Sequence, residues 1–273
     1  MGEEKYLKIN NNTWYCVSLF YSHKEIAVVM RSATSFYTDN KELINHLSIY
    51  LSIFQGERLD LVIASENEDR EFLYKRIHDY FSKTIKKYPS ETTSAIPYGN
   101  MIWMDYPNNS VYWNVFDIPD FLFNNPEVRL FAMYTSLLVI DLYDEESSID
   151  ENKKTILFFL ILKLIKTLNV DIADVYPTTS LGEKGVLDII DDITDTLHTM
   201  SYYWEFDDTD SNFDLWSKQI NIINTDKNTS LSEKIHSLIS VFYSHLGVSL
   251  SYQQNKIVPL LVKWDKWRKE LYS

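Results

Sequence analysis

Three closely spaced aspartates form the pattern in this sequence that most resembles a metal site. Residues 191–195 (DDITD) place carboxylates three and four positions apart, so that they share one face of a helix, and such oxygens can hold Mg²⁺ against a diphosphate. That chemistry also needs a second motif that ends in a glutamate, and here Asp226 and Ser230 lead to Lys234 instead. We therefore favour a solvated acidic helix face.

The other residue types give no sign of a cofactor. Six histidines are scattered along the chain, and none pairs with another histidine or a thiolate at helical spacing. The six glycines form neither of the patterns that cradle phosphates. Cys16 is the only cysteine, which rules out an intramolecular disulfide and favours a reducing compartment. The sequence predicts no metal and no other cofactor.

Charge and hydropathy exclude two classes of partner. With 26 basic and 39 acidic residues the net charge is -13, so the chain as a whole repels nucleic acid. The basic cluster around Lys83, Lys86 and Lys87 is typical of a solvated helix end. Residues 155–168 are apolar but shorter than the roughly 20 residues of a membrane span. Charges in residues 1–10 argue against a secretion signal, so we expect a cytoplasmic protein without a membrane partner.

Aromatic residues are abundant, with 19 Tyr, 14 Phe and 7 Trp. Most of them are expected to pack in the core. As a group they would also suit the walls of a cavity for a flat, heteroaromatic ligand, because stacking offers contact area at a low cost in side-chain entropy.

The elements that must position these residues segregate along the chain. Strands are expected at residues 13–21 and 58–64, helices at 40–54 and 68–86, hairpin strands within 88–119, and helices at 126–143, 151–168, 185–203, 232–246 and 257–271. An acidic connecting loop is expected at residues 205–214. This order predicts an α+β fold with an antiparallel or mixed N-terminal sheet, flanking helices and a helix-rich C-terminal half. Residues 1–273 form a single unit in this interpretation, with a sheet-containing lobe at 1–119 and a helical lobe at 120–273.

Three segments carry a resemblance to a known family. Residues 13–21 (TWYCVSLFY), 56–64 (GERLDLVIA) and 244–255 (SHLGVSLSYQQN) occur in an order similar to that of the lantibiotic-dehydratase C-terminal family, also called the thiopeptide-type bacteriocin biosynthesis domain. Glutamate-eliminating members carry Gly-x-His-Leu-Arg-Leu-Arg in the second segment and His-Met-x-x-Asn-Arg in the third. Here only Arg58 remains of the paired cations, and His245 is followed by Ser249 and Leu250 where Asn and Arg would stand.

This loss of cations makes the chain resemble the pyridine synthases of thiopeptide biosynthesis, of the thiocillin or micrococcin type. The resemblance implies a modified precursor peptide as substrate, with a leader and a core that contains thiazoles and two dehydroalanines. The implied reaction is a formal aza-[4+2] cycloaddition between these dehydroalanines, followed by loss of water and of the leader. Other biosynthetic enzymes are further expected partners, and the chain would act as a monomer or homodimer.

The implied reaction also suggests a site. Closing a flexible peptide is largely an entropic problem, and tautomerisation of an amide needs neutral proton donors and acceptors. The expected catalytic residues are His245, Ser249, Tyr252 and Gln253, and the expected substrate-binding residues are Ser251, Tyr202, Trp204 and Arg58. Equally, residues 249–255 could be a polar connection between helices. Two other functions stay open: the glutamate-eliminating component of a split dehydratase, and a non-catalytic protein that binds the precursor.

Overall fold

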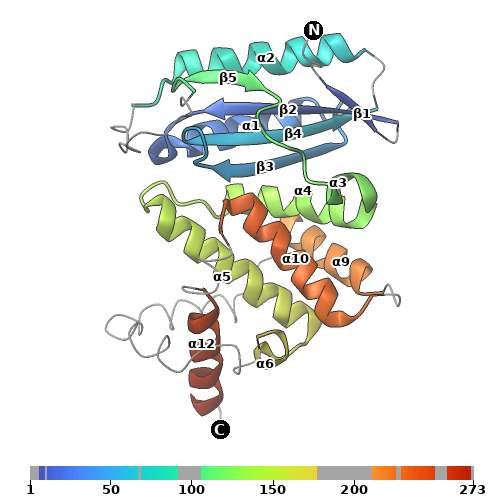
Figure 1. Ribbon diagram of the computed structural model, residues 1–273, viewed down its shortest axis with the longest axis vertical. Helices are drawn as coiled ribbons and strands as arrows, with labels where there is room; N and C mark the ends of the chain where they lie inside the picture. Colours follow the sequence, from blue (N-terminus) through green and yellow to red (C-terminus); the bar gives the residue numbers. More distant parts are fainter. Residues whose placement is uncertain are drawn as a thin grey trace. The chain divides into compact units, whose positions relative to one another are not determined.

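The computed structural model describes residues 6–9, 11–66, 69–91, 106–176, 211–225, 229–249 and 257–271. By backbone contacts the chain forms two compact units (Figure 1). Unit 1 comprises Met1–Ile149 together with His245–Gly247, and unit 2 comprises Asp150–Ser244 and Val248–Ser273. The α+β prediction is confirmed, since unit 1 holds an antiparallel sheet and the described residues of unit 2 are mostly helical. The prediction of one functional unit with lobes 1–119 and 120–273 stays a prediction.

The sheet of unit 1 is built around strand β2. In the described residues it contains β1 (Leu7–Ile9), β2 (Asn12–Phe20), β3 (His46–Ser52), β4 (Arg58–Ser65) and β5 (Ser110–Trp113). The order β1-β2-β4-β3 is antiparallel throughout, and β5 pairs with β2 beyond the end of β1. Both strands expected at residues 13–21 and 58–64 are confirmed as β2 and β4. β5 falls within the segment where hairpin strands were expected, and residues 92–105 lie outside the described part.

One face of this sheet is apolar and is covered by two helices. They are α1 (Ala27–Asp39) and α2 (Arg70–Lys87), which contact each other, and α2 also contacts β2 and β5 (Figure 1). Side chains alternate across a strand, so Val17, Leu61 and Ile49 share the face that α2 covers. The helix expected at residues 68–86 is confirmed, and it begins where the Asp69 carboxylate accepts a hydrogen bond from the Phe72 amide.

The prediction of a helix at residues 40–54 is wrong. This stretch contains strand β3, and the helix before it is α1, which the sequence analysis missed. Leu47, Ile49 and Leu51 alternate with His46, Ser48 and Tyr50, so the period is two rather than 3.6. The turn that follows requires Gly56, whose φ is 122° and where a Cβ atom would approach a ring carbon of Phe20 to 3.2 Å.

Helix α4 closes the outer edge of β3. It spans Pro126–Asp141 after the short helix α3 (Phe121–Asn124), and it begins with Asn125, whose side chain accepts from the amides of Glu127 and Val128. The proline and this cap explain why the predicted start at residue 126 is confirmed. The Ser136 hydroxyl accepts a hydrogen bond from the Ile49 amide at 3.1 Å, which satisfies a backbone donor that an edge strand would otherwise expose.

Among the described residues, the elements of unit 2 are helices. They are α5 (Ile149–Leu168), α6 (Ile172–Val175), α9 (Ser211–Asn224), α10 (Leu231–Leu246) and α12 (Val258–Leu271). The apolar run of α5 is buried, and the Lys163 ammonium lies 5.4 Å from the Phe213 ring centroid. The helices expected at 151–168, 232–246 and 257–271 are confirmed, whereas the one at 185–203 lies outside the described residues. The loop expected at 205–214 is corrected at its end, because α9 starts at Ser211. Across the described ranges of the chain, none of the helices combines the length and the apolar character that crossing a bilayer requires.

Candidate functional site

The second face of the sheet carries several buried polar groups. Ser18 on β2 pairs in register with Asp60 on β4, and Asp60 pairs with Tyr50 on β3. One step along the strands, Arg58 lies beside Ser52 and Phe20. All three strands therefore project hydroxyl, carboxylate or guanidinium groups from the face opposite to α2. This polar face is the candidate site of unit 1.

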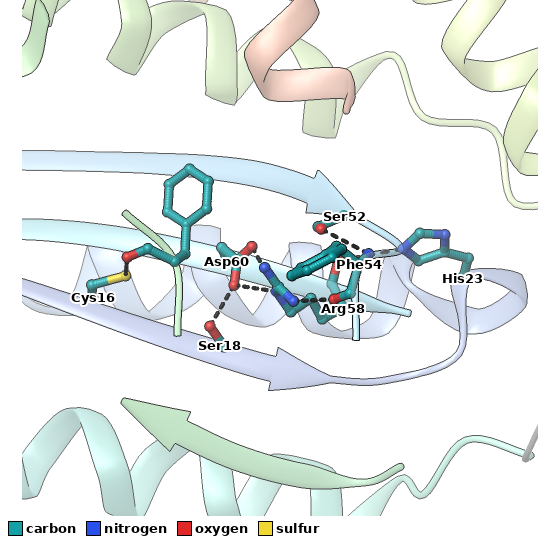
Figure 2. Close-up of polar contacts among 8 residues, drawn as sticks. Cys16, Ser18, His23, Ser52, Phe54, Arg58 and Asp60 are labelled. Atoms are coloured by element: carbon teal, nitrogen blue, oxygen red, sulfur yellow. Dashed lines mark hydrogen bonds and ion pairs between the residues drawn. The ribbon is translucent and has the colours of Figure 1, made fainter. Parts of the chain in front are cut away.

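Arg58 and Asp60 form a buried ion pair at its centre (Figure 2). The Arg58 Nε donates to both Asp60 oxygens at 2.9 Å, and Nη1 donates to the carbonyl oxygen of Phe54. The Ser18 hydroxyl donates to the same carboxylate. Burial raises the pKa of Asp60, and the Arg58 charge and these hydrogen bonds oppose that rise. Arg58, expected to bind substrate, is thus only 3% exposed and engaged within the protein.

Cys16 lies on the same face and is held as a neutral thiol. Its Sγ donates to the carbonyl oxygen of Phe116 at 3.2 Å, and the Phe116 ring stacks on Tyr50 at 4.8 Å between centroids. Burial and the nearby Asp60 charge raise the pKa of Cys16 to about 12. A thiol with this pKa is a poor nucleophile at neutral pH, which argues for a packing role.

His245 is the predicted catalytic residue that the structure places on this face. It is fully buried, its Nε2 lies 2.9 Å from the carbonyl oxygen of Ala132, and its ring centroid is 4.7 Å from that of Tyr50. A carbonyl oxygen only accepts, so Nε2 carries a proton. The imidazole is thereby fixed against Tyr50 in one orientation.

A second imidazole, which the sequence analysis missed, lies close to His245. The His46 Nε2 is 2.6 Å from the Ser48 hydroxyl, and its ring centroid lies 5.6 Å from that of Trp14. Burial, Arg129 and His245 lower the pKa of His46 to about 3, so His46 is neutral at physiological pH. The signal that could have found these residues is the alternation in HLSIYLS, which was interpreted as a helix.

The remaining predicted site residues are only partly within the described part of the chain. Ser249 is exposed, three residues after the end of α10. Ser251, Tyr252 and Gln253 lie outside the described residues, as do Tyr202 and Trp204 and the acidic motif at 191–195. The structure therefore brings His245 against Tyr50, and the grouping of His245 with residues 249–253 stays a prediction.

Comparison with known proteins gives a match in structure and none in sequence. No protein-family model and no curated protein sequence matches this chain. Among solved structures, the fold is similar to that of TbtD, a pyridine synthase from thiomuracin biosynthesis. The likeness has a TM-score of 0.56 and covers 95% of this chain and 98% of that one, at 11% sequence identity. At this identity the likeness shows the fold, and the chemistry has to be argued from the residues of this chain.

Two further features of the described residues bear on chemistry. Their His, Cys, Asp and Glu side chains include no group of three placed to hold a metal ion. In unit 1 a pocket of about 440 Å³ lies between α1 and the end of α4, with Met30 and Ile140 among its apolar lining and Arg31 and Asp141 among its charged lining. Arg31 also pairs with Glu145. None of the predicted site residues lines this pocket.

Proposed function

We propose that this protein is a thiopeptide pyridine synthase, acting on a precursor peptide that contains thiazoles and two dehydroalanines. The observation that carries the proposal is the likeness of fold to TbtD over nearly the whole length of both chains. The resemblance of residues 13–21, 56–64 and 244–255 to the lantibiotic-dehydratase C-terminal family implies the same reaction.

The proposed reaction is redox-neutral. One dehydroalanine and the adjacent amide, as its iminol tautomer, form the azadiene, and the alkene of the other dehydroalanine adds across it. Two new bonds close a six-membered ring and the macrocycle together. Loss of water and expulsion of the leader as a carboxamide then produce the aromatic pyridine.

The residues of this chain suit such chemistry in two respects. Ser249, Tyr252 and Gln253 offer hydroxyl and amide groups that can exchange protons with an amide oxygen, and His245 offers an acid or base. A shaped cavity would supply the pre-organisation that ring closure requires. Ser251, Tyr202 and Trp204 are proposed to contact the substrate. Arg58 is proposed to support the site from within the sheet, since binding a substrate anion would require it to leave Asp60.

The same ion pair bears on the competing elimination chemistry. A glutamate eliminase must recognise a glutamyl carboxylate, and the one cation kept from its strand motif is bound to Asp60 in a buried setting. Breaking such a pair leaves an uncompensated charge and costs about 3–5 kcal/mol. This cost favours the cycloaddition over glutamate elimination.

Intact-mass analysis of two substrates tests the proposal. With a bis-dehydroalanine, thiazole-containing precursor we expect a macrocycle that lacks water and the leader, plus the leader carboxamide. With a glutamylated precursor we expect no change in mass. Dehydroalanine formation without cyclisation would show the eliminase instead, and binding of both peptides without conversion would show a protein that only carries the precursor.

A further inference from the structure

The outer face of α2 carries a stripe of positive charge. Its apolar residues Leu73, Ile77, Phe81 and Ile85 are buried toward the sheet, while the opposite face points away from it (Figure 1). The exposed cations on that opposite face are Lys75, Arg76, Lys83, Lys86 and Lys87. Glu71 and Asp79 are the exposed acidic residues of this helix, so the stripe has a net charge of +3 in a chain whose net charge is -13.

The structure around these cations explains only some of them. Within the described part of the chain, none of the five forms an ion pair. Lys86 and Lys87 lie in the last turn of α2, where the partial negative charge of the helix end favours cations. Lys75, Arg76 and Lys83 lie too far from that end to benefit. Five like charges on one helix face repel one another, and an anionic partner would relieve that repulsion.

Exposed aromatic rings lie at both ends of the stripe. Phe72, in the first turn, is 46% exposed, and the Arg76 guanidinium lies 5.9 Å from its ring centroid. Tyr88, at the C-cap, is 50% exposed, with the Lys87 ammonium 4.8 Å from its centroid. At 1.5 Å per helical residue the two rings are roughly 24 Å apart along the axis, a span of about seven residues of extended peptide.

We propose that the outer face of α2 is a docking surface for an acidic peptide segment that carries apolar side chains near its two ends. Acidic residues would meet the five cations, and the apolar ends would cover Phe72 and Tyr88. A long polyanion such as RNA fits less well, because beyond the stripe it would meet the negative charge of the rest of the protein. This inference rests on the proposed function in one respect: the segment would belong to the precursor peptide, outside its reacting dehydroalanines.

Binding is measured separately from catalysis, by fluorescence anisotropy on the full chain. The probe is a short labelled peptide of glutamates with a phenylalanine near each end, and a peptide with lysine in place of every glutamate is its counterpart. The test variant is Lys83→Glu/Lys86→Glu/Lys87→Glu. The matched control, Lys24→Glu/Lys41→Glu/Lys218→Glu, reverses three exposed lysines elsewhere and therefore has the same net charge.

The glutamate peptide is expected to bind the wild type and the control with Kd values within about twofold, and the test variant at least about tenfold more weakly. Phe72→Ser should weaken binding without changing any charge. Equal Kd values for the two triple variants would overturn the proposal, as would tighter binding of an RNA oligomer or of anionic lipid vesicles. Because this assay involves no conversion, absence of a macrocycle in the mass assay would refute the proposed function and leave the docking result intact.

Discussion

Arg58 and Asp60, two positions apart on β4, hold each other inside the sheet, with Nε of Arg58 at 2.9 Å from both carboxylate oxygens. Their side chains are 4% and 0% exposed. Opposite charges at positions i and i+2 share one face of a strand, so the pair forms within a single element. Sequence comparison alone would assign this cation to substrate binding, whereas in the structure it binds Asp60 within the sheet.

Removing the cation should destabilise the protein strongly. Arg58→Met leaves Asp60 without its charge partner, and we expect the free energy of unfolding at pH 7 to fall by about 3–5 kcal/mol. The double variant Arg58→Met/Asp60→Leu should recover most of that loss, because neither charge then remains buried. Urea unfolding of the two variants measures both effects. A double variant as unstable as Arg58→Met would show that the two side chains are not coupled.

Stability should also fall as the pH decreases, through His46. Its folded-state pKa of about 3 lies below the ordinary value of 6.5, so its contribution is present above pH 6.5 and is lost progressively as the pH falls toward 3. Between pH 7.5 and 5 the loss should be about 2 kcal/mol. The groups facing this imidazole are Ser48, Trp14, Arg129 and His245.

His46→Gln provides the comparison, since glutamine does not titrate. Urea unfolding at the two pH values should show a smaller pH dependence for this variant than for the wild type, by about the same 2 kcal/mol. An identical pH dependence in both proteins would mean that His46 is not responsible.

Cys16 should report unfolding of unit 1. With a pKa of about 12 and a buried Sγ, the thiol is almost entirely protonated at pH 8. We expect modification by an aromatic disulfide reagent to be at least about a thousandfold slower in the native protein than in guanidinium chloride. The measurement is the absorbance of the thiolate that the reagent releases. Rapid labelling of the native protein would contradict the buried position of Cys16.

The proposed proton-transfer residues predict a loss of rate rather than of folding. Tyr252→Phe and Gln253→Ala should each lower kcat for macrocycle formation by about 10²–10³-fold, because each removes a donor near the reacting amide. Ser240→Ala, which removes an exposed hydroxyl on α10, is the control and should retain the wild-type rate. Initial rates from intact-mass spectra measure the effect. Unchanged rates in both variants, with precursor binding retained, would refute the site assignment.

Local signals in the sequence were sufficient for most of the described helices and for two strands. Pro126 and its capping Asn125 mark the start of α4, and the β-branched and aromatic residues of β2 mark a buried strand. β3 was missed because Leu43, Leu47, Leu51 and Phe54 also fit a helical period. That stretch becomes a strand through pairing with β4, which is information from a neighbouring element and not from the stretch itself.

The candidate site was less accessible from sequence for the same reason. Tyr50 meets His245 through its place on β3 in the sheet, and a position almost two hundred residues away gives no local sign of that contact. Arg58 was recognised as a lone cation. Its partner Asp60 stands two residues later in the sequence. The ion pair can be inferred only once the segment is known to be a strand, because residues i and i+2 then share one face.

The attachment of β5 to β2 sets a condition on how the chain reaches its native state. The Cys16 thiol contacts Phe116, 100 residues further along, and the Tyr112 and Trp113 backbones pair with the same strand. Closing so long a loop is entropically costly, and it cannot occur before the ribosome has released residues beyond 116. During synthesis β2 and Cys16 therefore lack these partners until the segment of β5 and Phe116 has emerged.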